Sequence, residues 1–367
     1  MNAPTPESLE RHEPLVDLII AVHTAERAIE RAVGSVLRGT AAPVRVTVVC
    51  HGVDPALIEA RLGPLADDPR VRLLPFTDGI PSPTGPFNHG LDAATARFTA
   101  TLGSDDELLS GAIDSWLAVQ RRFSADVVIP RVGLAEGPAS LRTPPTRPFR
   151  ARNLDGARDR LAYRTQQLGL VSRERFPDLR LTPGLRTGED IEYGLKLWFS
   201  GARIAFDRRG PAYWGHQDAT DRISMSARPV AEEFAFLDAA IDPGWIASLT
   251  RAQRVGVAVK MIRTHLMAGL SSRLMSSEIT APDRNALAEI ARRLVAVAPE
   301  ALEIISRRDA RILQMIVAGT PNQDTLRAEL AIRTDYRRAD NLLSASPLRL
   351  LHREAPVRFL TALALTP

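Results

Sequence analysis

The sequence predicts an α/β fold with a mostly parallel sheet covered by helices on both faces, followed by an α-helical C-terminal region. Two patterns support this prediction. Up to residue 75, short apolar runs alternate with segments of helical periodicity, which is typical of a parallel, helix-covered sheet. From residue 229 onward, helical periodicity dominates and strand-like runs nearly disappear. We therefore expect a flexible N-terminus, an α/β domain and a helical region: residues 1–14, 15–228 and 229–367.

The first elements follow in order from the spacing of apolar residues. The run VDLIIAV at 16–22 is rich in β-branched residues, as buried parallel strands are. Apolar residues at helical spacing over 25–37 predict a helix that Gly39 closes. Further strands are expected at 44–50, 71–74 and 98–102. Further helices are expected at 55–65, where Pro55 has a favoured first-turn position, and at 88–97. The Pro- and Gly-rich segment 78–86 predicts a loop.

The C-terminal region is expected to contain four longer helices, at 252–275, 284–297, 300–317 and 324–333. Its final segment, 347–367, mixes arginines with leucines. Such a segment suits a membrane surface, and it equally suits docking on the body of the protein. The region could also complete a substrate cleft or mediate self-association into a homo-oligomer. The sequence leaves these alternatives open.

The composition excludes several classes of protein. Hydrophobic content of 45% and charged content of 25% are ordinary for a globular chain and exclude wholesale disorder, a collagen-like fibre and a multi-span membrane protein. The single cysteine, Cys50, excludes an intramolecular disulfide and a zinc site built from cysteines. Residues 1–14 contain no apolar signal segment, and no run approaches the roughly 18 apolar residues of a membrane span. We therefore expect a cytoplasmic protein, or one peripheral to the inner face of the plasma membrane.

The net charge of +4 is unevenly distributed along the chain. Segment 142–186 holds eleven arginines and four acidic residues, so it carries more positive charge than the whole chain does. A local basic segment can steer an anionic ligand, and it can equally be a solvated face. A role in nucleic-acid binding is not supported, because no recognition motif accompanies the arginines.

Three polar motifs could carry chemistry. Ser104, Asp105 and Asp106 follow the expected strand 98–102, and ligands of α/β sheets bind where strands end. Carboxylates there suit a hard divalent cation, although Ser104 or Asp105 could instead cap the next helix. Glu189 and Asp190 precede an apolar helical pattern. They are either ordinary acids of a helix N-terminus or a general base.

The third motif runs from Tyr213 to Ser226 and includes His216, Arg222 and Ser224. Arginine binds phosphate oxygens in a bidentate manner, but the motif alone is a weak signal.

Taken in order, these motifs resemble the family 2 glycosyltransferases of GT-A fold. The family's first strand, "IIPVYN.E", corresponds to IIAVHTAE at 19–26, and its "VVDDGS" corresponds to VVCHGV at 48–53. The family's "N.G" and "FLDSDD" correspond to NHG at 88–90 and TLGSDD at 101–106, and its later "ED" to Glu189-Asp190. The strand-loop "YY.....S.S" corresponds to residues 213–226. The resemblance covers about residues 15–228.

The resemblance implies a Rossmann-like GT-A sheet with a nucleotide half near 15–107 and an acceptor half near 108–228. It implies inverting transfer of a sugar from a nucleotide-diphosphate donor to a hydroxyl group. The acceptor would be a glycan or a phosphorylated or lipid-linked molecule. Such transfer most commonly serves the synthesis of cell-envelope polysaccharide. Asp190, with Glu189, would be catalytic, and Mn²⁺ or Mg²⁺ would bind at Asp105 and His216. Residues expected at the nucleotide are Ala21, Val22, His23, Glu26, Cys50, His51, Asn88, Ser104 and Asp105. Residues expected at the diphosphate or acceptor are Asp106, Arg164, Arg222 and Ser224.

Three positions depart from the family pattern. His23 replaces a tyrosine, Cys50 replaces the aspartate that usually reads the base, and Gly103 replaces the first aspartate of "DSDD". A thiol cannot accept the imide N–H of uracil as a carboxylate does. We therefore expect that backbone groups read the base, or that the base is not uracil. The departures also support an alternative, a catalytically impaired scaffold that binds a nucleotide or glycan. A nucleotidyltransferase shares the acidic site, but the late Glu189-Asp190 helix argues against it.

Overall fold

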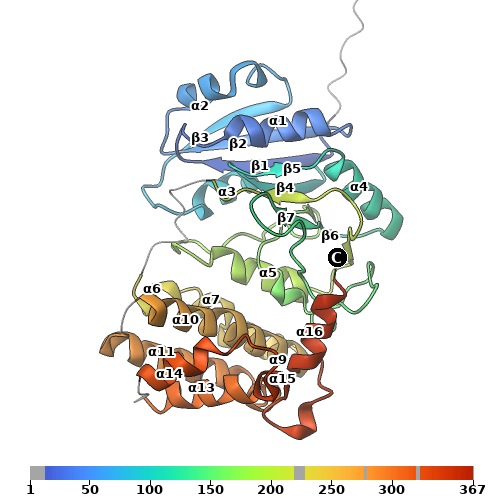
Figure 1. The fold of residues 1–367 in the computed structure, drawn as a ribbon. Coiled ribbons are helices and arrows are strands. Elements are labelled where there is room, and N and C mark those ends of the chain that lie inside the picture. Colours follow the sequence, from blue (N-terminus) through green and yellow to red (C-terminus); the bar gives the residue numbers. More distant parts are fainter. Residues whose placement is uncertain (1–12, 219–227, 277–278, 320–322, 367) are drawn as a thin grey trace, which may run out of the picture.

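The structure is a computed structural model that describes residues 13–218, 228–276, 279–319 and 323–366. It has two parts that lie one above the other in Figure 1. The upper part is a helix-covered sheet, and the lower part is a bundle of helices. The last helix, α16 (Pro356–Ala364), runs along one side of the molecule and spans from the bundle toward the sheet (Figure 1).

The central sheet of the described residues has seven strands in the order β3-β2-β1-β4-β8-β6-β9. Only β8 runs antiparallel to its neighbours, so the sheet is mostly parallel, as predicted. Its strands are β1 (Val16–Val22), β2 (Val44–His51), β3 (Val71–Phe76), β4 (Phe98–Gly103), β6 (Val127–Ile129), β8 (Leu170–Ser172) and β9 (Ile204–Phe206). A smaller sheet contains β5 (Glu107–Leu108), β10 (Tyr213–Gly215) and β7 (Val132–Leu134), in that order.

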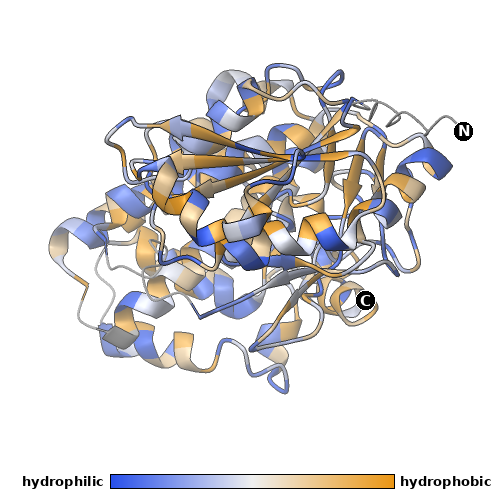
Figure 2. Cartoon of the chain, turned by 90° about the horizontal axis from the view of Figure 1, so that it is seen from above, coloured by the Kyte–Doolittle hydropathy of each residue, from blue (hydrophilic) through white to orange (hydrophobic). Residues whose placement is uncertain are grey.

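Helices cover both faces of the central sheet. Figure 1 shows α1 and α2 above the sheet and α3 and α5 below it. These helices are α1 (Ile29–Gly39), α2 (Pro55–Leu62), α3 (Thr84–Asp92), α4 (Ala112–Phe123) and α5 (Glu189–Phe199), with short 3-10 turns η1 (Gly63–Leu65) and η2 (Leu161–Tyr163). Because both faces are covered, nearly every residue of β1 is buried, including Leu18, Ile19 and Ile20. Figure 2 shows the strands of this sheet as hydrophobic.

The C-terminal part is helical, as predicted. Its elements are α6 (Val230–Glu233), α7 (Leu237–Ala240), α8 (Pro243–Ser248), α9 (Arg251–Lys260), a π-helical turn η4 (Met261–Leu266), α10 (Met267–Ser276), α11 (Ala281–Val297), α12 (Ala301–Ile304), α13 (Arg307–Val317), α14 (Gln323–Ala331), α15 (Ala339–Leu342), η5 (Pro347–Arg349) and α16. Its core also contains Ile191 and Leu195 of α5. The helix that begins with Glu189 and Asp190 therefore packs against the helical part.

Several predicted boundaries were wrong for local reasons. The helix expected at 25–37 begins at Ile29 and includes Gly39. The helix expected at 88–97 lies at Thr84–Asp92, because Pro86 is tolerated in a first turn and does not extend the loop. The helix expected at 300–317 is broken before Arg307, since the Ser306 side chain caps a new helix by accepting from Asp309 N. The helix expected at 252–275 is interrupted by the π-helical turn.

The final segment docks on the body through one face of α16. The Phe359 ring lies 4.8 Å from the Tyr163 ring, measured between centroids. The buried carboxylate of Glu354 lies 3.7 Å from the guanidinium groups of both Arg160 and Arg263. The docking alternative is therefore correct for this face of the helix. Across the ranges that the structure describes, no helix is long and apolar enough to cross a membrane.

Candidate active site

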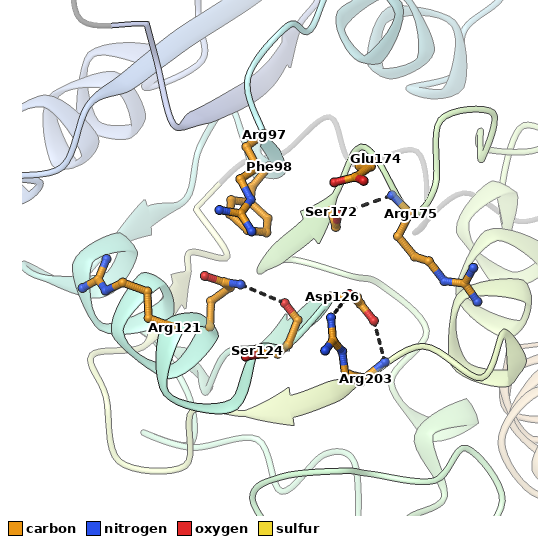
Figure 3. Close-up of a pocket in the computed structure, with 11 residues that line it drawn as sticks. Arg97, Phe98, Arg121, Ser124, Asp126, Ser172, Glu174, Arg175 and Arg203 are labelled. Atoms are coloured by element: carbon orange, nitrogen blue, oxygen red, sulfur yellow. Dashed lines mark hydrogen bonds and ion pairs between the residues drawn. The ribbon is translucent and has the colours of Figure 1, made fainter.

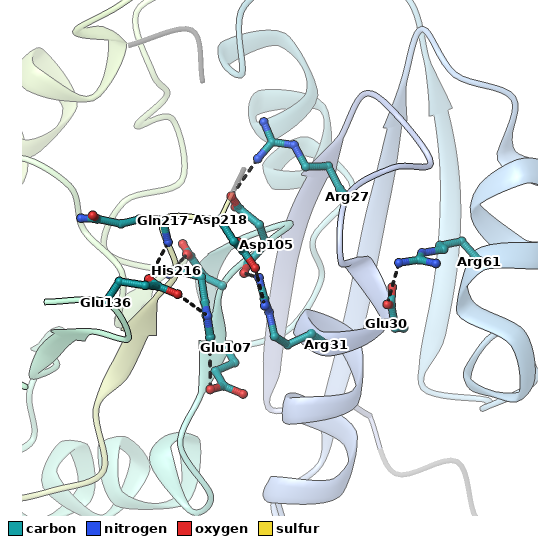
Figure 4. A network of polar contacts seen from close by, with 11 residues as sticks. Arg27, Glu30, Arg31, Arg61, Asp105, Glu107, Glu136, His216, Gln217 and Asp218 are labelled. Carbon is teal, nitrogen blue, oxygen red and sulfur yellow. Dashed lines mark hydrogen bonds and ion pairs between the residues drawn. The ribbon is translucent and has the colours of Figure 1, made fainter. Parts of the chain in front are cut away.

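The end of β4 meets the start of α1 through an ion pair. Arg27 Nη1 lies 2.8 Å from Asp105 Oδ2, and both side chains are only about one-eighth exposed, at 12% and 13%. One turn further on, Arg31 donates to the main-chain oxygen of Asp105 and pairs with Asp218 at 2.9 Å (Figure 4). Two arginines thus contact Asp105, the residue that was expected to hold a cation, one at its carboxylate and one at its main-chain oxygen. The idea that Ser104 or Asp105 caps the next helix is wrong, because β5 intervenes and Gly111 precedes α4.

Asp106 joins the two sheets. Its carboxylate accepts the Tyr213 hydroxyl and, at 2.9 Å, the backbone N–H of His216. The Tyr213 oxygen also accepts from Gly103 N at 3.0 Å. Burial, and then the charge of Asp106, raise the pKa of Tyr213. A side chain at position 103 would collide with the Asp106 carboxylate. A residue other than glycine at position 103 would therefore require the Asp106 carboxylate to shift.

His216 lies between two carboxylates. Its Nε2 is 3.2 Å from Glu107 Oε1, and its Nδ1 is 3.7 Å from Glu136 Oε1 (Figure 4). The structure therefore brings both predicted metal ligands, Asp105 and His216, to one corner of the molecule, each beside its own protein partner. Within the described ranges, no group of three or more His, Cys, Asp or Glu side chains is arranged to hold a metal ion.

The predicted nucleotide-binding residues of β1 and β2 lie on adjacent strand ends. Val22 is paired with Cys50, and Ala21 with Gly103, while His23 and Glu26 follow in the loop before α1. Burial raises the pKa of the Cys50 thiol to about 11. The thiol is therefore neutral at ordinary pH.

A histidine–carboxylate pair lies beside these strand ends. His51 Nε2 is 2.7 Å from Asp78 Oδ1. The Phe76 ring lies between His51 and His89, with centroid distances of 5.6 and 5.0 Å. An aromatic surface and a carboxylate thus lie near the ends of β2 and β3, on the sheet face that bears Val49, whereas Cys50 packs into the core on the other face.

Of five other predicted residues, three are buried or bonded within the protein and two lie outside the described residues. Asn88 exchanges two hydrogen bonds with the backbone of Leu181, at 2.9 and 3.0 Å. Arg164 is buried and donates to the main-chain oxygen of Pro130 at 2.5 Å, and burial lowers its pKa to about 10. Ser104 is also buried. Arg222 and Ser224 lie outside the described residues.

The basic segment 142–186 is largely used inside the protein. Arg147 pairs with Asp159, Arg160 with Glu354, Arg180 with Asp92 and Arg186 with Glu232, whereas Arg173 donates to the main-chain oxygens of Thr95 and Ala96. These contacts account for much of the local positive charge.

Glu189 and Asp190 form the first turn of α5, which Gly188 begins in a left-handed conformation. Burial, and to a smaller extent the neighbouring charge of Asp190, raise the pKa of Glu189 to about 7. Burial also raises the pKa of Asp190, while the charge of Lys260 lowers it. These acids therefore begin a helix, as one of the two interpretations expected, and burial makes them more basic than ordinary carboxylates.

Asp190 lines a cavity of about 360 Å³ between the two parts of the molecule. The helical part contributes Phe234, Phe236 and His265, and the α/β part contributes Thr165, Thr187 and Gly188. Lys260 is buried behind this cavity with its Nζ against His265 Nε2. Burial lowers the pKa of Lys260 to about 7 and that of His265 well below its ordinary value. Asp190 therefore faces an open cavity large enough for part of a small ligand.

Another cavity, of about 560 Å³, lies at the opposite edge of the sheet, where β6 and β9 begin. Figure 3 shows that its side chains do not converge on one point, because Arg121 and Arg175 extend in opposite directions. Arg203 is paired with Asp126 at 3.2 Å. This cavity is not a candidate active site.

The sequence reasoning missed five polar residues of the site: Arg27, Arg31, Asp78, Lys260 and His265. Arg27 and Arg31 are spaced by four residues at a helix N-terminus just after the first strand, and this spacing could have placed both on one face. Lys260 is one of two lysines and stands in the apolar run VGVAVKMI. Asp78 gave no signal beyond its place in a loop.

Comparisons with known proteins agree with this geometry. Residues 17–179 match the family model of glycosyl transferase family 2. Among solved structures, S. aureus TarS 1-349 in complex with UDP-GlcNAc matches with a TM-score of 0.69 and 16% identity, over 87% of this chain and 91% of that chain. The same TarS segment in complex with UDP matches with a TM-score of 0.67, also at 16% identity and over the same shares of the two chains. Longer S. aureus TarS matches with a TM-score of 0.66 and 15% identity, over 87% of this chain and 55% of that chain. Among curated protein sequences, none matches significantly. These findings confirm the predicted GT-A fold and the resemblance to family 2.

Proposed function

We propose that this chain, which carries a glycosyltransferase domain of family 2 over residues 17–179, is an inverting enzyme that uses Asp190 as its general base. The single observation that carries the proposal is the position of Asp190. It begins a helix at the boundary of the two parts of the molecule, it lines a cavity, and burial raises its pKa. A base whose pKa lies nearer to neutral accepts a proton more effectively at cellular pH.

The reaction is one in-line displacement. Asp190 accepts the proton of the acceptor hydroxyl while the acceptor oxygen forms its bond to the anomeric carbon of the donor. The bond from that carbon to the diphosphate oxygen breaks on the opposite face, and the diphosphate leaves with the bonding electron pair. The configuration at the anomeric carbon is therefore inverted. Glu189, whose pKa is about 7, stands beside Asp190 and is partly protonated at neutral pH, which limits repulsion between the two carboxyl groups.

The donor is proposed to bind where β1, β2 and β3 end. The neutral Cys50 thiol does not replace the aspartate of the family pattern, but Asp78, held by His51, supplies a carboxylate near the ends of β2 and β3. A carboxylate there can accept the imide N–H of uracil. The TarS complexes with UDP-GlcNAc and UDP support a uridine donor for this chain as well. Two alternatives remain: backbone groups recognise the base, or the base is not uracil. A screen of donor sugars with different bases decides between them.

A divalent cation is proposed at Asp105. A carboxylate fits Mn²⁺ or Mg²⁺, which prefer oxygen ligands, and donor diphosphate oxygens would be the remaining ligands. When bound, such an ion supplies positive charge to the departing diphosphate. Arg27 pairs with this carboxylate in the structure, so Arg27 has to turn away before the cation binds. His216, the second predicted ligand, would have to leave Glu107 in the same way.

The acceptor is proposed to be a hydroxyl of a glycan, in synthesis of a cell-envelope polysaccharide or glycopolymer. Phe234 and Phe236 offer apolar rings in the cavity, and Thr165 and Thr187 offer hydroxyl groups. This combination suits a sugar, which has both apolar faces and hydroxyl groups.

The Arg27–Asp105 ion pair supports a second candidate, a scaffold that binds a nucleotide or glycan without turnover. A screen of UDP-, GDP-, dTDP- and CDP-sugars with Mn²⁺ or Mg²⁺, read by release of the nucleoside diphosphate, separates the two. Release that is lost in Asp190→Asn supports the transferase. Binding of a nucleotide by calorimetry without release from any sugar, with or without glycan acceptors, supports the scaffold.

A further inference from the structure

One side of the molecule carries an exposed row of large apolar side chains, which we call the apolar ridge. It comprises Phe149, Leu348, Leu350, Leu351, Val357 and Leu365. Among the large hydrophobic residues that the structure describes, the three most exposed all belong to this ridge: Leu348 at 93%, Phe149 at 83% and Leu351 at 82%. A soluble protein scatters exposed leucines singly, so such clustering indicates a contact surface.

The ridge follows the C-terminal segment. Leu348 lies in η5, Leu351 comes shortly after it, and Val357 lies at the start of α16. At the other end, Arg208 donates to the main-chain oxygens of both Arg150 and Leu365, at 3.3 and 3.1 Å. This guanidinium places Phe149 beside the end of α16. Figure 1 shows α16 running along the outer side of the molecule between these two ends.

Buried contacts fix the segment that carries the apolar ridge to the body of the protein. Glu354 is buried between Arg160 and Arg263, and Phe359 packs on Tyr163. The Arg160 guanidinium also donates to the main-chain oxygen of Arg353. The exposed leucines are therefore presented by a docked segment, and the opposite face of α16 already has its partner.

Positive charges surround the leucines. Arg349, Arg353 and Arg358 lie within the same segment, and the Arg358 side chain donates to the main-chain oxygen of Leu351 at 3.4 Å. Glu303 pairs with Arg349 at 2.8 Å and offsets its charge, whereas Glu354 is buried between Arg160 and Arg263, so Arg353 and Arg358 supply the positive charge beside the leucines. Apolar tips ringed by arginines complement a surface with an apolar interior and anionic head groups.

A second copy of the chain fits this ridge poorly. In a two-fold dimer the same patch meets itself, so Arg353 and Arg358 of one copy would lie near the same two arginines of the other copy across an apolar contact. Like charges at close range disfavour such an interface.

We propose that the apolar ridge docks the protein on a membrane surface rich in anionic lipids. Leu348, Leu351 and Phe149 enter the boundary between head groups and acyl chains, and the neighbouring arginines contact lipid phosphates. This inference does not depend on the proposed catalytic activity.

The test is flotation of the full chain with vesicles of phosphatidylcholine alone and of phosphatidylcholine with 30% phosphatidylglycerol. The wild type is expected to float with the anionic vesicles and to be released by raised salt. The double variant Leu348→Ser/Leu351→Ser should reduce the partition coefficient at least about ten-fold, since each leucine loses its buried apolar area. Arg353→Gln/Arg358→Gln should reduce binding to anionic vesicles only. Leu57→Ser, an exposed leucine on α2 away from the ridge, is the matched control.

Three results would overturn the proposal. They are a wild type that floats with neither vesicle, equal losses in Leu57→Ser and in the double leucine variant, and unchanged binding in the double leucine variant. Sedimentation velocity at two protein concentrations identifies the competing occupant. If the leucine variant abolishes self-association and the wild type ignores vesicles, the ridge is an interface between copies.

Discussion

Substituting Glu189 by glutamine should stabilise the protein at alkaline pH. Burial holds the Glu189 carboxyl protonated up to about pH 7 in the folded chain, whereas in the unfolded chain it ionises near its ordinary value of 4.5. Between these two values, folding takes up a proton, so stability falls as pH rises. The difference between the folded and unfolded pKa of Glu189 corresponds to about 3 kcal/mol in the free energy of unfolding. We reduce this value to about 2 kcal/mol because the carboxyl is partly accessible to solvent.

Urea unfolding at pH 5 and at pH 8 measures this effect. The wild type should lose stability between the two values through Glu189, and Glu189→Gln should lose about 2 kcal/mol less. Glu174→Gln, at an exposed position, is the control for general effects of charge. An identical pH dependence in Glu189→Gln and the wild type would refute the reasoning that burial keeps this carboxyl protonated.

Three further predictions concern the residues around the strand ends. Tyr213→Phe removes the hydroxyl that links Gly103 N to Asp106 and should cost about 2–4 kcal/mol in urea unfolding; a loss below about 0.5 kcal/mol would contradict the linking role. Arg27→Gln releases the Asp105 carboxylate and should tighten binding of Mn²⁺ alone several-fold in calorimetry, while unchanged affinity would remove Asp105 as the ligand. Asp78→Asn should weaken UDP about ten-fold and leave GDP unaffected, and equal losses for both would show that Asp78 does not read the base.

The strands were the most predictable part of the fold. Strands β1, β2 and β4 are buried on both faces, so their sequences are nearly continuous β-branched or apolar runs that need no partner to be identified. The helices were found by periodicity, but their ends depended on local detail. Ser306 begins a new helix where the apolar pattern runs on, because its side chain satisfies a backbone N–H.

The site was predictable only where the chain order preserves a motif. Asp105 and Asp190 stand at a strand end and a helix start, and both positions follow from sequence. The Arg27–Asp105 pair joins residues 78 positions apart in the chain, and nothing local to either residue indicates it. Asp106 was expected at the diphosphate, yet the Tyr213 hydroxyl and the His216 backbone hold it. These contacts arise because β10 packs beside β5. Both strands are too short to be identified from the sequence.

The apolar ridge is a second feature that the sequence predicted only in part. The sequence indicated a mixture of arginine and leucine over 347–367 but did not separate buried positions from exposed ones. The structure separates them, because Phe359 and Glu354 dock the segment while Leu348 and Leu351 point away from the core.

The proton acceptor is the most direct test of the account. With the donor sugar found in the screen, turnover of wild type and Asp190→Asn should be compared together with donor affinity by calorimetry. We predict that kcat falls about 10²–10⁴-fold while the donor Kd and the urea midpoint stay close to those of the wild type. An Asp190→Asn variant that retains most of its turnover with an intact fold would contradict the assignment of Asp190 as the base.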